Sequence, residues 1–135
     1  MPSLLDISIL VAGGLFLPIL LPCFLQGPLP VFDGLLPGVM DSNYLAHPMT
    51  EHVFLIDMGK NLTLVLLCAW ASLLQTNVAT KKAVASLMSI QNLWAAFVAH
   101  GLASPEMLGE LVVAAALMVA AILLTAPDAK AGKKK

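Results

Sequence analysis

The sequence predicts an all-α integral membrane protein that crosses the bilayer four times, with both termini on the same, positively charged side. Of the 135 residues, 59% are hydrophobic and only 11% are charged, whereas a soluble domain of this size exposes far more polar surface. Four apolar stretches approach the length of about 20 residues that a helix needs to cross a bilayer. Among the segments that flank these stretches, those that contain a cluster of lysines alternate with those that contain no basic residue. One four-helix transmembrane domain, residues 1–135, follows from these observations.

The first predicted span covers residues 4–26. Pro18 and Pro22 each lack a backbone N–H donor, so the second half of this helix is predicted to kink or to end early. A cleaved signal peptide is the alternative for this segment. It is disfavoured because no basic residue precedes the apolar run, and Asp6 lies where a positive charge would be expected.

Residues 27–50 are predicted to form an irregular loop on the side of the membrane opposite the termini. Their density of proline and glycine argues against regular helix. Several apolar side chains in the same stretch suggest that the loop lies on the membrane surface or against a neighbouring protein. The helix-breaking residues are Pro28, Pro30, Gly34, Pro37, Gly38 and Pro48.

The second predicted span covers residues 53–77, at the end of a longer helix that begins with Thr50 as its N-cap. At about 1.5 Å per residue, a helix from Thr50 to Asn77 is about 40 Å long, which exceeds the hydrocarbon thickness of about 30 Å. Asp57 and Lys60 are therefore expected near the edge of the hydrocarbon.

The third and fourth predicted spans cover residues 83–100 and 106–126. Gly101 is a suitable C′ residue for the third helix. The sequence of residues 104–106 is Ser-Pro-Glu, which supplies an N-cap, a proline at N1 and an acid in the first turn of the fourth helix. Pro127 is expected to end that helix.

The distribution of lysine predicts the orientation. All seven basic residues are lysine, and the loops after the first and third spans contain none of them. Lys81 and Lys82 lie between the second and third spans. By the positive-inside rule, both termini face the cytoplasm, stroma or matrix. The remaining cluster is the tail, with Lys130, Lys133, Lys134 and Lys135.

The third span carries the most informative polar side chains. Ser89, Asn92 and His100 recur at helical spacing with Ala96 between them, and Gln91 flanks this stripe. Polar groups within lipid usually form hydrogen bonds between helices, so one interpretation gives this stripe a structural role. In the functional alternative, a bound ligand is contacted by His100, Asn92 and Gln91. Chlorophyll, carotenoid and lipid are the candidate ligands.

Two further groups of ionisable residues are candidates for a functional site. Asp57 and Lys60 are three residues apart and can pair on one helix face, either as an interfacial pair or as part of a functional site. His47, Glu51 and His52 offer ligand types that zinc or copper accepts, but their spacing matches no metal signature. No catalytic residue and no metal site are predicted. Without arginine or a lysine stripe, nucleic-acid binding is not expected either.

The layout resembles the ergosterol biosynthetic protein 28 family, whose members are small four-span scaffolds of the ER with a basic tail. The resemblance is carried by Met58-Gly59 at the second span, by the Gly-Leu-Ala-Ser-Pro sequence of residues 101–105, and by the lysine tail. It covers about half of the chain. The resemblance implies a non-catalytic ER scaffold, and no role of an individual residue is carried over.

Three functions remain open at this point. The preferred one is a non-catalytic accessory or scaffold subunit of a larger membrane complex, in partnership with other membrane protein subunits. The expected setting is an energy-converting assembly, a photosystem or a respiratory complex, in the thylakoid or mitochondrial inner membrane. An ER scaffold that tethers lipid-biosynthetic enzymes is the second function. The third is a small membrane enzyme or transporter in which Asp57, Lys60 and His100 converge on a cavity.

Overall fold

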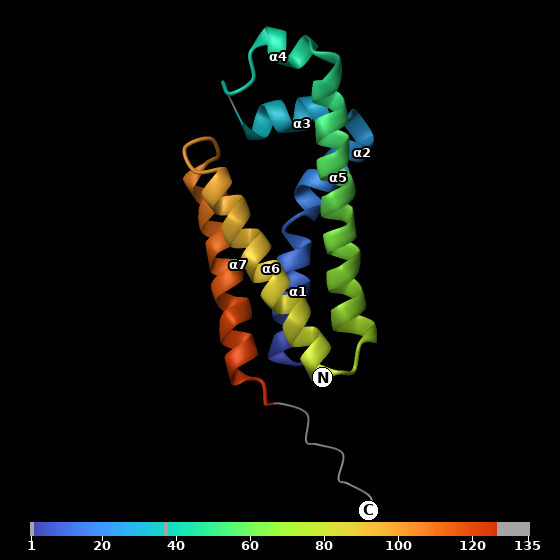
Figure 1. The fold of residues 1–135 in the computed structure, drawn as a ribbon, viewed down its shortest axis with the longest axis vertical. Helices are drawn as coiled ribbons and strands as arrows, with labels where there is room; N and C mark the ends of the chain where they lie inside the picture. The colour runs from blue at the N-terminus through green and yellow to red at the C-terminus, as the bar shows by residue number, and fades with distance from the viewer. Residues whose placement is uncertain (1, 37, 127–135) are drawn as a thin grey trace, which may run out of the picture.

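The computed structural model describes residues 2–36 and 38–126, and every regular element in these ranges is a helix. Long helices run along the length of the molecule, and short helices lie at one end (Figure 1). The helices are α1 (Leu4–Gly14), α2 (Leu17–Gln26), α3 (Pro28–Leu35), α4 (Ser42–Ala46), α5 (Pro48–Ala69), the π-helical turn η1 (Trp70–Leu74), α6 (Val78–Val98) and α7 (Pro105–Leu124).

The predicted break in the first apolar segment is confirmed. Helix α1 ends at Gly14 and α2 begins at Leu17, with Pro18 in its first turn. Proline is tolerated there because the first backbone N–H groups of a helix have no intrahelical acceptor. The break turns α2 away from the axis of α1 (Figure 1).

The prediction of an irregular loop over residues 27–50 is wrong, because this segment contains α3, α4 and the start of α5. Pro28 and Pro30 fall in the first turn of α3, where their missing donors cost nothing. Helix α3 is held against α5 by Phe32 and Phe54, whose rings stack with centroids 4.3 Å apart. Proline density alone was misleading because it did not distinguish helix starts from helix interiors.

The N-cap of α5 is His47, so the prediction of Thr50 as the cap is wrong. The Nδ1 atom of His47 accepts a hydrogen bond from the backbone N–H of Met49 at 3.2 Å, and Pro48 occupies the first turn. Thr50 is buried, and its hydroxyl donates to the carbonyl oxygen of Tyr44 at 2.6 Å. This residue therefore ties α4 to α5 and does not start the helix.

The predicted start of α7 is confirmed, whereas α6 begins at Val78 and not at residue 83, so Lys81 and Lys82 lie in its first turns and not in a connection. Ser104 is the N-cap of α7, its hydroxyl accepts from the N–H of Met107, and Pro105 begins the helix. Gly101 has a φ of 81°, in the left-handed region, but it lies two residues after the C-cap Ala99. Pro127 and the lysine tail lie outside the described residues.

Three helical segments are long and apolar enough to cross a membrane: Leu4–Gln26, Pro48–Leu74 and Pro105–Leu124. They correspond to the predicted spans 4–26, 53–77 and 106–126. The predicted span at 83–100 corresponds to α6, which is 21 residues long but is not among the three. Its polar residues, Lys81 and Lys82 in the first turns and Gln91 and Asn92 near the middle, lower its hydropathy.

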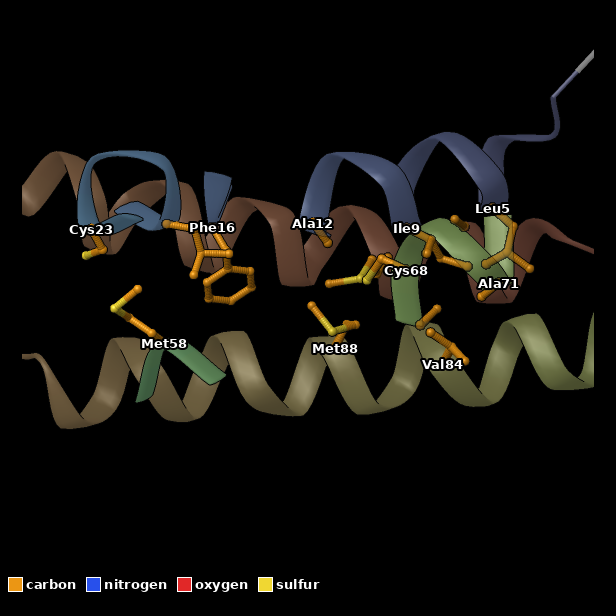
Figure 2. Packing of buried hydrophobic residues seen from close by; sticks show 14 residues of the cluster. Leu5, Ile9, Ala12, Phe16, Cys23, Met58, Cys68, Ala71, Val84 and Met88 are labelled. Atoms are coloured by element: carbon orange, nitrogen blue, oxygen red, sulfur yellow. The ribbon is translucent and has the colours of Figure 1, made fainter. Parts of the chain in front are cut away.

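The core lies where α1, α5, α6 and α7 meet (Figure 2). On α1, buried side chains recur every three or four residues, which is the spacing of one helix face. This face packs on Cys68 of α5 and Met88 of α6, both fully or almost fully buried. The α1 residues are Leu5, Ile9 and Ala12, and Phe16, the N-cap of α2, continues the same cluster.

Gly13 marks a close approach between α1 and α5. A Cβ atom added at Gly13 would lie 2.7 Å from the Cβ of Cys68, whereas one added at Gly14 would meet nothing within 4 Å. We expect Gly13→Ala to destabilise the protein by about 1–3 kcal/mol, because the two helices must separate. Thermal unfolding in mild detergent measures the effect.

Gly14→Ala is the matched control for this prediction. It is expected to leave the stability unchanged or to raise it by up to about 1 kcal/mol, since alanine favours helix over glycine. Equal effects of the two substitutions would contradict the close contact between α1 and α5.

Polar contacts connect the helices at the end of the bundle that holds the N-terminus of α1 (Figure 1). Asp6 of α1 accepts a hydrogen bond from the Nζ of Lys81 of α6, and its backbone carbonyl accepts one from the hydroxyl of Ser72 in η1 at 2.9 Å. The Nζ of Lys82 donates to the backbone carbonyl of Thr125, just after α7. The N-terminus of α1 and the C-terminus of α7 therefore lie at the same end of the molecule.

Candidate functional site

A cavity of about 440 Å³ lies between the α1–α2 junction, α3, α5, α6 and the start of α7. Its volume is in the range of about 300–1,000 Å³ that is typical of small-molecule sites. Most of the lining side chains are apolar or aromatic, and a few are polar. The polar side chains are Asp57, Lys60, Asn61, Gln91 and Glu110.

The apolar wall is built from several helices. Phe32 and Phe54 form one side, and their stacked rings join α3 to α5. Gln91, Trp94, Ala95 and Val98 line the cavity from α6. Their spacing of three, four and seven residues from Gln91 places all four on one face of that helix. In Figure 1, α5 and α6 are close at the Gln75–Asn77 connection and diverge toward the end where α3 lies.

Three residues of α5 form a hydrogen-bonded group at the cavity. The Nζ of Lys60 donates to one carboxylate oxygen of Asp57 at 2.5 Å, and the amide nitrogen of Asn61 donates to the other at 3.0 Å. The predicted pairing of Asp57 with Lys60 is confirmed. Asn61 is only 4% exposed, and its Oδ1 atom has no hydrogen-bond partner within the described residues. The group thus leaves one buried acceptor unsatisfied.

Gln91 and Glu110 face the same cavity from α6 and α7. Neither side chain forms a hydrogen bond or an ion pair with another residue in ranges 2–36 and 38–126. Glu110 also lines a second hollow of about 540 Å³, toward the turn between α6 and α7, together with Glu106. The two hollows share Leu15 and Met107 as well, so they are adjacent.

The predicted ligand contacts on the third span are separated by the structure. Gln91 lines the cavity, while Asn92 is fully buried in the helix bundle, and its Nδ2 and Oδ1 both lack partners among the described residues. His100 is exposed, follows the end of α6 and is not part of the cavity lining. The hydroxyl of Ser89 donates mainly to the carbonyl of Ala85 at 2.8 Å, with a long contact of 3.5 Å to Ala115 of α7.

Asn61, Trp94 and Glu110 were not predicted as site residues. The sequence carried one usable signal for Asn61, because it lies four residues after Asp57 and one after Lys60, on the same helix face. For Glu110 the signal was an acid in the second turn of an apolar helix. For Trp94, only the packing of α6 against its neighbours shows which face borders a cavity.

His47, Glu51 and His52 are exposed around the first turns of α5. His47 serves as the N-cap, and the Nδ1 of His52 lies 3.1 Å from the carbonyl oxygen of Pro48. Within the described residues, no group of three His, Cys, Asp or Glu side chains is arranged to hold a metal ion.

Comparisons with known proteins assign no family to this chain. No protein-family model matches it, and neither does any curated protein or solved structure. The resemblance to the ergosterol biosynthetic protein 28 family therefore gains no support from these comparisons. The site has to be interpreted from its own geometry.

Proposed function

We propose that this protein is a non-catalytic membrane subunit that holds one lipid-like amphiphile in the cavity between α3, α5 and α6. The observation that carries the proposal is the cavity itself, because its walls are apolar and its few polar groups lie on α5, α6 and α7. An amphiphile has the same division into an apolar chain and a polar head group. The volume accommodates part of a lipid, so the remaining chain would extend into the bilayer.

Binding is favoured over chemistry at this site. The enzyme or transporter alternative needs Asp57, Lys60 and His100 to converge, and His100 does not line the cavity. Asp57 already accepts two hydrogen bonds, from Lys60 and Asn61. A carboxylate that is engaged in this way serves better as a structural anchor than as a general base.

The proposal includes α6 as a fourth span. This helix is 21 residues long and lies beside α7 over the length of the bundle (Figure 1). A helix of that length measures about 30 Å, which matches the hydrocarbon thickness. Its polar side chains face protein at Ser89 and Asn92, as intramembrane polar residues usually do. With four spans, both termini lie on one side, and we propose the positive side of the membrane.

For the wider setting, we propose an accessory or scaffold role in a larger membrane complex. An energy-converting assembly of the thylakoid or mitochondrial inner membrane remains the first choice, with an ER scaffold as the alternative. Gentle extraction followed by a native gel and mass spectrometry identifies the partner subunits. Migration of the native protein as a lone chain would contradict the role as a subunit.

Filling the cavity tests the binding function. Ala95 lines the cavity on α6, so Ala95→Trp is expected to reduce the bound lipid about tenfold, by occupying the space of the ligand. Native mass spectrometry of the full chain, purified in mild detergent, counts the bound molecules. An absorption spectrum of the same sample shows whether chlorophyll or carotenoid is the ligand instead.

The control is Ala116→Trp, at an exposed position of α7 outside the cavity lining. It adds the same bulk and is expected to leave the bound lipid unchanged. Equal retention of lipid by the Ala95 variant and the wild type would show that the cavity is not the binding site.

A further inference from the structure

We infer that the cavity selects an amphiphile whose head group donates hydrogen bonds, specifically a primary ammonium. This inference rests on the proposed binding function and names the chemistry of its ligand. It follows from the unpaired acceptors at the cavity and from the charge of the lining side chains.

Two donor groups of α5 at the cavity each form one hydrogen bond within the protein. The Nζ of Lys60 and the amide nitrogen of Asn61 both donate to Asp57. Two acceptor groups at the cavity have no donor among the described residues: the buried Oδ1 of Asn61 and the carboxylate of Glu110. Gln91 adds one acceptor and two donors. Only a ligand that donates hydrogen bonds can satisfy these two acceptors, and the buried Oδ1 of Asn61 is the more costly of them to leave unpaired.

The charge of the lining side chains points to the same ligand. Asp57 and Glu110 contribute two negative charges and Lys60 one positive charge, so the cavity carries a net charge of −1. Glu106 in the adjacent hollow adds a further negative charge. These charges favour a cation and oppose an anionic head group.

A quaternary ammonium is the closest competitor. Its positive charge would also be attracted by the acidic side chains and by the ring of Trp94. It has no N–H group, however, so the Oδ1 of Asn61 and the carboxylate of Glu110 would stay without a donor. Phosphatidylethanolamine and phosphatidylcholine differ in just this respect, since three methyl groups replace the three ammonium hydrogens.

The test uses the full chain reconstituted in vesicles that hold equal amounts of phosphatidylethanolamine, phosphatidylcholine and phosphatidylglycerol with identical acyl chains. After gentle extraction, native mass spectrometry measures the lipid that stays bound. We expect phosphatidylethanolamine to be retained about tenfold over phosphatidylcholine, the effect of about one hydrogen bond to a charged group. Phosphatidylglycerol is expected to be retained least.

Glu110→Gln and Asn61→Leu are expected to abolish most of this preference. Glu110 is exposed and has no partner in the described chain, so its substitution leaves the fold intact. Glu51→Gln is the matched control, because Glu51 is exposed at the start of α5 and does not line the cavity. It is expected to keep the preference of the wild type.

The possible results separate the two proposals. Retention of lipid with no preference for phosphatidylethanolamine over phosphatidylcholine, or a preference unchanged in Glu110→Gln, overturns the head-group inference and leaves the binding function standing. Retention of no lipid at all overturns the binding function itself.

Discussion

Asp6→Asn is expected to destabilise the bundle by about 3–5 kcal/mol, because it leaves the buried ammonium of Lys81 without its counter-charge. The side chains of Lys81 and Asp6 are only 13% and 11% exposed, and their charged atoms are 2.5 Å apart. The pair joins α1 to α6 across 75 positions of the sequence. Asparagine keeps the shape of the side chain and an acceptor for Ser3, but its NH2 group cannot accept from Lys81, so the change removes both the charge and the hydrogen bond to the ammonium.

The comparison variant for this prediction is Asp57→Asn, which removes the exposed pair with Lys60. Those side chains are 34% and 48% exposed, and an exposed ion pair contributes less than about 1 kcal/mol. Thermal unfolding in mild detergent is measured for both variants. The double variant Asp6→Asn, Lys81→Met is expected to recover much of the loss, since the unpaired charge is removed. Equal destabilisation by Asp6→Asn and Asp57→Asn would show that Lys81 is solvated.

Asn92→Leu is expected to raise the stability by about 1–3 kcal/mol, which is the cost of a buried polar group without a partner. Asn92 is fully buried, and neither its Nδ2 nor its Oδ1 finds a partner within the described residues. Leucine branches at the same carbon as asparagine, so it replaces two unsatisfied polar atoms with methyl groups of similar placement.

Asn92→Ala is the comparison variant, because it removes the amide as leucine does but does not fill the space of the side chain. Alanine also removes the amide, but it leaves a void in the bundle and is expected to be less stable than the leucine variant by about 2–3 kcal/mol. Both variants are measured by the same thermal unfolding. Destabilisation by leucine as large as that by alanine would mean that the amide of Asn92 is satisfied in the native protein.

The parts of the fold that the sequence predicted correctly are those determined by neighbouring residues. The end of α1 near Pro18, the Ser104 cap of α7 and the pair of Asp57 with Lys60 depend on groups within four residues of one another. Backbone donors, proline rings and side chains at that spacing interact in any helix, whatever surrounds it. The same holds for the three apolar segments, because length and composition define a potential span.

The tertiary structure decided which face of each helix meets another part of the chain. Gln91 and Asn92 are adjacent, yet one lines the cavity and the other is enclosed in the bundle. The sequence shows Asp6 as an acid where a signal peptide would carry a positive charge, but its partner Lys81 lies on a different helix. Helix periodicity relates residues on one helix, but it does not give the rotation of one helix against the next. The core, the ion pair and the cavity all depend on that rotation, so only the packed structure reveals them.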